Sequence, residues 1–317
     1  MPPLADRLAL ADLTMRALGV DAELPPKIGV HPRQPGSLAH AMPALLRGDS
    51  SDGSDDLLGA KWIAGFPANP ASGLPAYSAL VLLNDPLTGQ PIAVMDAAAI
   101  TAQRTAAISG VAIRAVLEAR PSLREQAEIR IAILGAGVQA RAHLPVIGTL
   151  LPRAEVAVMD ADGARAESCV EEARAVEGIR GAAVVGSVRE AVDRADVVVS
   201  VVSFGPDRQS MDPAWLTADA VTVAVDYDMQ APAALAREAF FAVDDRTQFL
   251  STRDETTFAG YPDPAFTIGD LLSGRALPPD TGRVLVAHLG VGLADVVFAA
   301  AVLARAEQLG IGRILPR

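Results

Sequence analysis

The chain has 317 residues, of which 50% are hydrophobic and 21% are charged, so it is long enough to bury one large core or two modest ones. Its formal net charge of −11 argues against nucleic acid and anionic membranes as partners, because both require a basic face. Its apolar runs are far shorter than the roughly 20 residues that span a bilayer, and its single cysteine, Cys169, excludes an intrachain disulfide. We therefore expect a cytoplasmic protein without a secretory signal and without a bound metal.

The first 120 residues predict a mixture of helices and strands around a hairpin. We expect a helix over about 4–18, strands over 60–66, 77–83 and 91–96, and a long helix over 97–118. The segment between the first helix and the first strand is rich in Gly, Pro and Asp, and its acidic part, 48–56, predicts a surface loop.

Residues 121–290 predict a second, larger domain in which strands and helices alternate. The expected strands are 129–134, 155–160, 183–185, 195–202, 221–226 and 239–243, with helices ending near 150 and over 162–175 and 187–193. This alternation with continuous apolar strands predicts an α/β fold with a parallel sheet that is covered on both faces. A last helix over 293–309 is expected to return to the first domain, which is then discontinuous and consists of 1–120 and 291–317.

A glycine-rich turn follows the first strand of this domain. Gly135, Gly137 and Ala140 form a G-x-G-x-x-A pattern, typical of the doubly wound Rossmann-type sheet that binds a dinucleotide. The turn and the helix that starts with Val138 and Gln139 would hold the pyrophosphate. Asp160 ends the next strand, where a carboxylate binds the adenosine ribose, so NAD is favoured; Arg165 keeps NADP open.

The basic residues point to an anion-binding site. The chain has 25 arginines but only two lysines, Lys27 and Lys61, and an arginine-rich coding background explains the arginines better than it explains the lysines. Arg104 lies near the start of an apolar helix, where a cation opposes the helix dipole. We expect Lys61 and Arg104 to hold a substrate carboxylate. The alternative is an ordinary ion pair with an acid such as Asp96.

Several segments, in this order and spacing, resemble the ornithine cyclodeaminase/μ-crystallin family: Met42-Pro43-Ala44, KWIAGFPANP (61–70), DPLTGQP (85–91), ITAQRTAA (100–107), GAGVQAR (135–141) and the ending Gly290-x-Gly292-x-x-Asp295. The resemblance covers about residues 26–312. It implies an NAD(P)-dependent oxidoreductase that acts at the C–N bond of a small amino acid, imine or cyclic imine. It also implies a homodimer, in which the discontinuous domain binds substrate and forms the interface.

The resemblance also implies roles for individual residues. Asp226, at the carboxyl edge of the sheet, would be the acid or base at the substrate nitrogen, with Lys61 as a second catalytic group. A simple cap of the strand end is the alternative for Asp226. Lys27 and Met42 would contribute to the substrate site. The remaining cofactor contacts would come from Thr105, Ser200, Val201 and Gly290.

The chain departs from the family mainly in its substrate half. His40 stands where ornithine-converting members place a glutamate, which disfavours the second candidate reaction, cyclodeamination of ornithine or lysine with tightly bound NAD. The loop at Tyr227 and Asp228 and the segment around His288 also differ from the family pattern. A third possibility is a binding protein that depends on NAD(P)H but has no turnover.

The remaining polar residues have structural explanations. His143 is expected to be a packed or capping histidine, and Cys169 to be inert. Asp244-Asp245-Arg246 is interpreted as a solvent-exposed turn.

Overall fold

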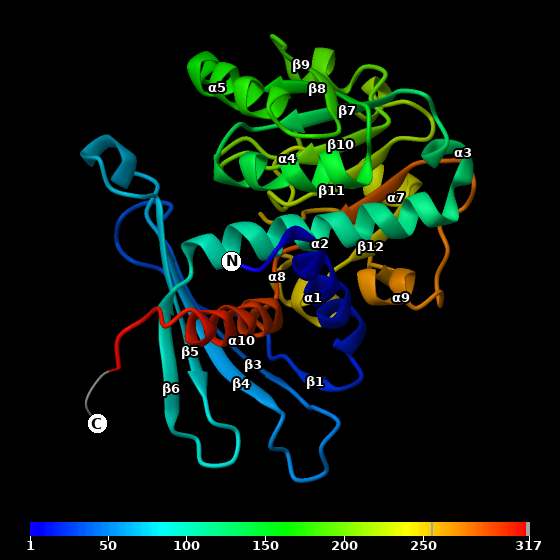
Figure 1. The fold of residues 1–317 in the computed structure, drawn as a ribbon. Helices are drawn as coiled ribbons and strands as arrows, with labels where there is room; N and C mark the ends of the chain where they lie inside the picture. The colour runs from blue at the N-terminus through cyan, green and yellow to red at the C-terminus, as the bar shows by residue number, and fades with distance from the viewer. Residues whose placement is uncertain (255, 315–317) are drawn as a thin grey trace. The chain divides into compact units, whose positions relative to one another are not determined.

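The computed structural model describes residues 1–254 and 256–314 (Figure 1). The chain divides into two compact units. Unit 1 consists of Met1–Arg104 and the C-terminal segment from Val291, and unit 2 of Thr105–Gly290. The two boundaries between the units therefore lie next to predicted site residues. One boundary falls inside a long helix, between Arg104 and Thr105, and the other directly after Gly290.

Unit 1 contains an antiparallel sheet, here called sheet A, in the order β1-β3-β4-β5-β6, with β2 paired to β3. Its strands are β1 (Ala22–Glu23), β2 (Ile28–Val30), β3 (Leu38–Leu46), β4 (Leu57–Gly65), β5 (Tyr77–Asn84) and β6 (Pro91–Asp96). Its helices are α1 (Leu4–Ala17), the short 3-10 helix η1 (Asn69–Ser72), the first turns of α2 (Ala98–Ala119) and α10 (Gly292–Gln308).

Sheet A has one buried and one exposed face, because successive side chains of a strand point to opposite sides. Helix α10 packs across β3, β4 and β5 and against α1 (Figure 1). Met42, Lys61 and Val81 lie opposite one another on these three strands and are buried. The neighbouring row, which includes Trp62 and Leu80, is exposed on the other face.

Unit 2 is built on a parallel sheet, sheet B, in the order β13-β12-β14-β11-β10-β7-β8-β9. Its strands are β7 (Ile129–Leu134), β8 (Ala154–Met159), β9 (Ile179–Val184), β10 (Val197–Ser200), β11 (Val221–Ala224), β12 (Phe240–Val243), β13 (Phe266–Thr267) and β14 (Val284–Ala287). Its helices are the rest of α2, α3 (Pro121–Arg124), α4 (Val138–Leu150), α5 (Gly163–Arg174), α6 (Val188–Val192), η2 (Pro213–Trp215), α7 (Ala233–Glu238), α8 (Arg246–Thr252) and α9 (Ile268–Leu272). The predicted α/β class with a doubly wound parallel sheet is confirmed.

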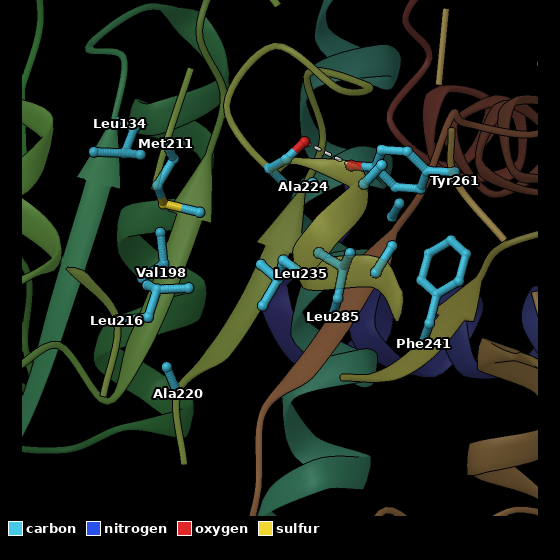
Figure 2. Close-up of a cluster of buried hydrophobic side chains, with 14 of the residues drawn as sticks. Leu134, Val198, Met211, Leu216, Ala220, Ala224, Leu235, Phe241, Tyr261 and Leu285 are labelled. Atoms are coloured by element: carbon cyan, nitrogen blue, oxygen red, sulfur yellow. Dashed lines mark hydrogen bonds between the residues drawn. The ribbon is translucent and has the colours of Figure 1, made fainter. Parts of the chain in front are cut away.

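The strand order reverses between β7 and β10, which is where an open α/β sheet binds its ligand, beyond the carboxyl ends of the strands. Every residue of β10, β11 and β14 is buried, so both faces of the sheet are covered. Figure 2 shows the core on one face, where Leu134, Val198, Ala224 and Leu285 come from four adjacent strands. This packing fixes the strand ends that carry the predicted site residues.

The secondary-structure prediction missed the short strands β1, β2 and β13, and it was wrong or incomplete at three further strands. It gave no strand to residues 38–46, which form β3, a nine-residue strand of sheet A. It started the third strand of the parallel sheet at 183, whereas β9 begins at Ile179. It also missed β14, which lies between β11 and β12 in the middle of sheet B.

Within residues 1–254 and 256–314, no helix has the length and apolar character needed to cross a membrane.

Candidate functional site

Unit 1 places two cations on one buried carboxylate. The Lys61 ammonium nitrogen, from β4, lies 2.5 Å from Oδ2 of Asp295, in the first turn of α10. The Arg104 Nε, from α2, donates a hydrogen bond of 3.0 Å to the other carboxylate oxygen, Oδ1. Lys61 is 1% exposed, Arg104 4% and Asp295 0%. Lys61 and Arg104 are therefore paired with Asp295, and not with Asp96, which was the alternative from the sequence.

With Lys61 protonated, this cluster carries one positive charge more than the single carboxylate of Asp295 neutralises. Burial lowers the pKa of Lys61 to about 7, with repulsion from Arg104 and Lys27 adding to the effect and attraction by Asp295 opposing it. Burial opposes ionisation of Asp295, but Arg104 and Lys61 hold its pKa below the usual value. The Nη1 of Arg104 is buried and has no hydrogen-bond partner among the described residues. A carboxylate ligand would satisfy both the charge and this donor.

Of the other substrate-site residues expected in unit 1, Met42 and His40 lie on β3, and Lys27 directly precedes β2. Met42 is buried and is the direct partner of Lys61 between β3 and β4. His40 lies two residues before it on β3, and burial, followed by Lys27, His31 and Lys61, lowers its pKa to about 4. Its imidazole is therefore neutral at pH 7 and surrounded by positive charge. Lys27 acts electrostatically on both His40 and Lys61.

The glycine-rich turn of unit 2 has the shape that a dinucleotide requires. Gly135 has a φ of +94°, and a Cβ on it would lie 2.7 Å from the carbonyl oxygen of Val201. A Cβ on Gly137 would meet nothing within 4 Å, so the space above this residue is open. Gly137 also caps α4 without a side-chain hydrogen bond, which leaves the first N–H groups, from Val138 onward, to bind phosphate oxygens.

Asp160 is held against the glycine-rich turn. Its Oδ2 accepts a 2.7 Å hydrogen bond from the backbone N–H of Ala136, and its Oδ1 accepts one of 2.8 Å from Asp162. Each oxygen has a second lone pair that can accept a ribose hydroxyl. Arg165 is half exposed and forms an ion pair of 3.2 Å with Asp162. The residues present therefore fit a dinucleotide, and Asp160 lies directly beside the glycine-rich turn.

Asp226 is a buried carboxyl group just past the end of β11. Its Oδ2 accepts hydrogen bonds from the Ser200 hydroxyl, at the end of β10, and from the Val202 N–H at 3.3 Å. Its Oδ1 is buried and has no hydrogen-bond partner in the part of the chain that the structure describes. Burial raises the pKa of Asp226 to about 7, and the Ser200 hydrogen bond opposes this rise. Asp226 can therefore donate or accept a proton near neutral pH.

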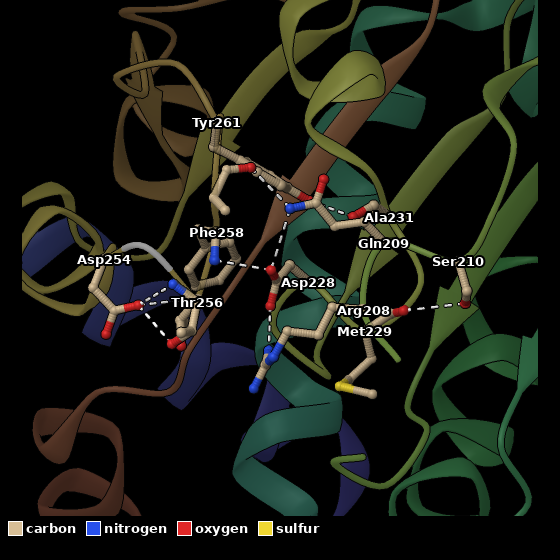
Figure 3. Close-up of polar contacts among 12 residues, drawn as sticks. Arg208, Gln209, Ser210, Asp228, Met229, Ala231, Asp254, Thr256, Phe258 and Tyr261 are labelled. Carbon is tan, nitrogen blue, oxygen red and sulfur yellow. Dashed lines mark hydrogen bonds and ion pairs between the residues drawn. The ribbon is translucent and has the colours of Figure 1, made fainter. Parts of the chain in front are cut away.

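The unusual loop after Asp226 is fixed by the buried Asp228 (Figure 3). This carboxylate forms an ion pair with Arg208 and accepts hydrogen bonds from the Phe258 N–H at 2.8 Å and the Gln209 side chain at 3.4 Å. It thereby ties the loop after β11 to the loop after β10. Tyr227, between the two aspartates, has a φ of +62°, and its ring packs on Phe258. The charge of Asp228 also contributes to the raised pKa of Asp226.

Three buried polar residues connect α2, α4 and the end of β14. His143 Nδ1–H donates to the Gln139 carbonyl at 2.7 Å, so its Nε2 accepts from the Ser109 hydroxyl at 2.8 Å. Ser109 in turn accepts from His288 Nε2–H at 2.8 Å. Burial lowers the pKa of His143 to about 4, which keeps it neutral. His143 is thus a packed histidine, as predicted, and His288 is buried.

Gly290 is held at both of its backbone polar groups. Its N–H donates to Asp244 at 2.7 Å, and its carbonyl accepts from the Gln248 side chain at 3.0 Å. The interpretation of Asp244 as part of a solvent-exposed turn was wrong, because Asp244 is fully buried and organises Gly290. Thr105, which was also expected to contact the cofactor, is the first residue of unit 2 and is buried. Cys169 is buried in α5, and burial raises its pKa, which keeps the thiol protonated.

The chain belongs to the ornithine cyclodeaminase/mu-crystallin family, whose sequence model matches residues 5–308. It is 31% identical to the nodulation efficiency protein NfeD of Rhizobium meliloti, over 99% of this chain and 94% of that protein. It is 28% identical to an alanine dehydrogenase of Archaeoglobus fulgidus, over 93% of this chain and 88% of the relative.

Solved structures with the same fold include two enzymes that contain a nicotinamide cofactor. The Δ1-pyrroline-2-carboxylate reductase of Thermococcus litoralis, in complex with NADH and L-proline, has a TM-score of 0.82 and 22% identity, with 99% of this chain and 96% of that chain covered. An archaeal alanine dehydrogenase dimer with bound NAD also has a TM-score of 0.82, with 24% identity and coverage of 99% and 95%. At these identities the likeness shows the fold.

Proposed function

We propose that the protein is an NAD(P)-dependent oxidoreductase that converts a small α-imino acid, either open-chain or cyclic, into the corresponding amino acid. The observation that carries the proposal is Asp226, a buried carboxyl group with a pKa of about 7 and one oxygen without a hydrogen-bond partner in the described residues. Such a group suits proton transfer to a nitrogen at neutral pH. The related alanine dehydrogenase and the similar pyrroline-2-carboxylate reductase act on compounds of this class.

The glycine-rich turn and Asp160 would hold the cofactor, NAD in preference to NADP. The N–H groups at the start of α4 would bind the pyrophosphate, and Asp160 would accept hydrogen bonds from the adenosine ribose. Ser200, Val201, Thr105 and Gly290 are proposed as further cofactor contacts. When bound, the nicotinamide supplies or takes up a hydride.

Lys61 and Arg104 would bind the carboxylate of the substrate. The buried surplus charge and the unused Nη1 of Arg104 favour this role, with Lys27 and Met42 completing the site. Binding the carboxylate orients the C=N bond, and a fixed orientation supplies much of the rate of a reaction between two bound partners. Asp226 would give its proton to the imine nitrogen while the neighbouring carbon is reduced.

The electropositive surroundings of His40 favour this reaction over cyclodeamination. A cyclodeaminase binds the distal ammonium group of a diamino acid, which requires a negative or strongly polar partner. His40 is neutral, and Lys27 and Lys61 act on it as positive charges. An ammonium group placed beside these residues would be repelled.

We also propose that the exposed face of sheet A forms a homodimer interface. Ile28, Trp62 and Leu80 lie in one cross-strand row and are 62%, 48% and 51% exposed, and Val94 on β6 is 61% exposed. An apolar patch of this kind on a soluble domain marks a contact surface. We expect the native chain to be a dimer in light scattering. We expect Trp62→Glu to be a monomer with unchanged thermal stability, and this result would support the interface. A dimer that survives the substitution would rule it out.

NADH consumption distinguishes the candidate functions. A reductase consumes one NADH for each amino acid formed from Δ1-pyrroline-2-carboxylate, or from pyruvate with ammonia. A cyclodeaminase releases ammonia from ornithine or lysine without a net change in NADH absorbance. A binding protein without turnover does neither. Stoichiometric loss of NADH supports the proposal, and either of the other two results contradicts it.

A further inference from the structure

We infer that Asp295 is a positioning residue that sets the geometry and the charge of the carboxylate-binding pair, Lys61 and Arg104. The inference builds on the proposed function, because it assigns the control of the substrate-binding cations to a residue that does not itself bind substrate. Asp295 is 191 residues from Arg104 in the chain and belongs to the last helix, yet it contacts both cations.

The two oxygens of Asp295 are divided between the two cations. Oδ2 lies 2.5 Å from the Lys61 ammonium, and Oδ1 accepts from Arg104 Nε at 3.0 Å. The bond through Nε fixes the plane of the guanidinium group. It leaves Nη1, which has no partner among the described residues, for a ligand. A carboxylate that bridges two cations in this way holds them at a constant separation.

Helix α10 gives Asp295 a rigid base. The first turns of the helix, residues 292–299, are entirely buried. A Cβ on Gly292 would lie 2.6 Å from the Met42 carbonyl oxygen, so the start of the helix is in close contact with β3. Met42 is also the strand partner of Lys61. The position of Asp295 relative to Lys61 is therefore set by backbone packing on two sides.

Asp295 also raises the pKa of Lys61 and so favours its ammonium form. Burial and two neighbouring cations, Arg104 and Lys27, lower the pKa of Lys61 to about 7, and Asp295 is the group that opposes them. His40, which also interacts with Lys61, is neutral at this pH. Without Asp295, Lys61 would lose its proton at a lower pH, and less of its ammonium form would remain at pH 7.

The two lysines of the chain permit a direct measurement of this effect. Protein labelled with [13Cε]lysine gives two lysine signals, and Lys27→Arg assigns the one that belongs to Lys61. In the native chain we expect the Lys61 signal to titrate near pH 7, and in Asp295→Asn at least one pH unit lower. An unchanged Lys61 titration in Asp295→Asn overturns the inference, whether or not the protein reduces imino acids.

A second variant separates position from charge and remains informative if Asp295→Asn fails to fold. Asp295→Glu keeps the charge but moves the carboxylate by one methylene group. We expect Lys61 to titrate near pH 7 as before, while the KM for the imino acid rises about tenfold and the Kd for NADH does not change. Asp12→Asn, which removes an exposed ion pair with Arg16 on α1, is the matched control and should leave both unchanged. A native KM in Asp295→Glu overturns the positioning role.

The outcomes also separate this inference from the proposed function. If native protein turns over no imino acid but Lys61 shows the expected pH shift in Asp295→Asn, the proposed function fails and the relationship between Asp295 and Lys61 stands. The Lys61 signal can also be followed during addition of pyrrole-2-carboxylate, a planar and unreactive carboxylate. Its Kd should rise about tenfold in Asp295→Glu, and an unchanged Kd counts against the inference.

Discussion

The Ser200 hydroxyl donates a hydrogen bond to Oδ2 of Asp226, and both side chains are buried at the ends of adjacent parallel strands. This bond stabilises the ionised carboxylate, so it opposes the rise in the pKa of Asp226 that burial causes. Ser200 therefore tunes the pH at which Asp226 releases its proton.

Ser200→Ala should shift the pH dependence of the reaction to higher pH. Imine reduction needs the protonated form of Asp226, so kcat/KM should fall as the pH rises through about 7 in the native enzyme. Without the Ser200 hydrogen bond the pKa of Asp226 rises further, and the falling limb should move upward. Asp226→Asn is the control, and it should lower turnover by at least about 100-fold with dinucleotide binding intact. If the falling limb of the kcat/KM profile does not move in Ser200→Ala, Ser200 does not set the pKa of Asp226.

Gly135→Ala and Gly137→Ala should have different effects, although both change the same turn. Gly135 has a φ of +94° and little room for a Cβ, so alanine should lower the free energy of unfolding by about 1–3 kcal/mol. Gly137 has open space around it, so alanine should leave thermal unfolding unchanged but weaken NADH binding, because a methyl group would occupy the approach to the pyrophosphate. Calorimetry and NADH fluorescence titration measure the two effects. Equal losses of stability would contradict this distinction.

The sequence predicted strands β7, β8, β10 and β11 of sheet B well, but it missed β14 in the same sheet and β3 in sheet A. The apolar strands β7, β10 and β11 and the glycine-rich turn have strong local patterns. Strand β14 lies in the middle of the sheet because it pairs with β11 and β12, and this long-range pairing has no local signal in the sequence. Strand β3 contains a histidine and a proline, which mask its alternation, although Met42 and Ala44 are buried as in any two-faced strand.

Arg104→Lys should raise the KM for the imino acid while the Kd for NADH stays the same. Lysine retains the positive charge but cannot bond to Asp295 and to a ligand in one plane. Losing one charge-assisted hydrogen bond should cost about 1.5–3 kcal/mol, roughly tenfold or more in affinity. Steady-state kinetics at fixed NADH measure this effect. Native kinetics for both Arg104→Lys and Arg104→Ala would remove Arg104 from the site.

The sequence identified the two cations of the candidate site, but it did not identify the carboxylate that pairs with both of them. Lys61 stood out because lysine is rare in this chain, and Arg104 because it lies at an unfavourable end of a helix. Their shared partner, Asp295, was noticed only as part of a C-terminal motif, because the contact spans 191 residues. Asp244 was misread because acidic residues after a strand are usually solvated, whereas here the N–H of Gly290 satisfies the carboxylate.

NADH should bind more tightly than NADPH. Asp160 lies against the turn with its carboxylate fixed by two backbone N–H groups, so a 2′-phosphate would meet a negative charge. We expect a difference of about tenfold in Kd by fluorescence titration, reduced in Asp160→Ala. Arg165→Ala should leave the ratio unchanged, because the Arg165 side chain is paired with Asp162. Tighter binding of NADPH would instead assign Arg165 to the 2′-phosphate.

Transfer of deuterium tests the proposed reaction most directly. Native protein is incubated with NADH that is fully deuterated at C4 of the nicotinamide and with Δ1-pyrroline-2-carboxylate, and in parallel with pyruvate and ammonia. If the protein reduces an α-imino acid, mass spectrometry of the amino acid formed will show one deuterium at Cα for each NADH consumed. In Asp226→Asn this labelled product should fall at least about 100-fold at pH 7. An amino acid without deuterium at Cα, or equal labelling in Asp226→Asn, would contradict the proposed reaction and the role of Asp226 in it.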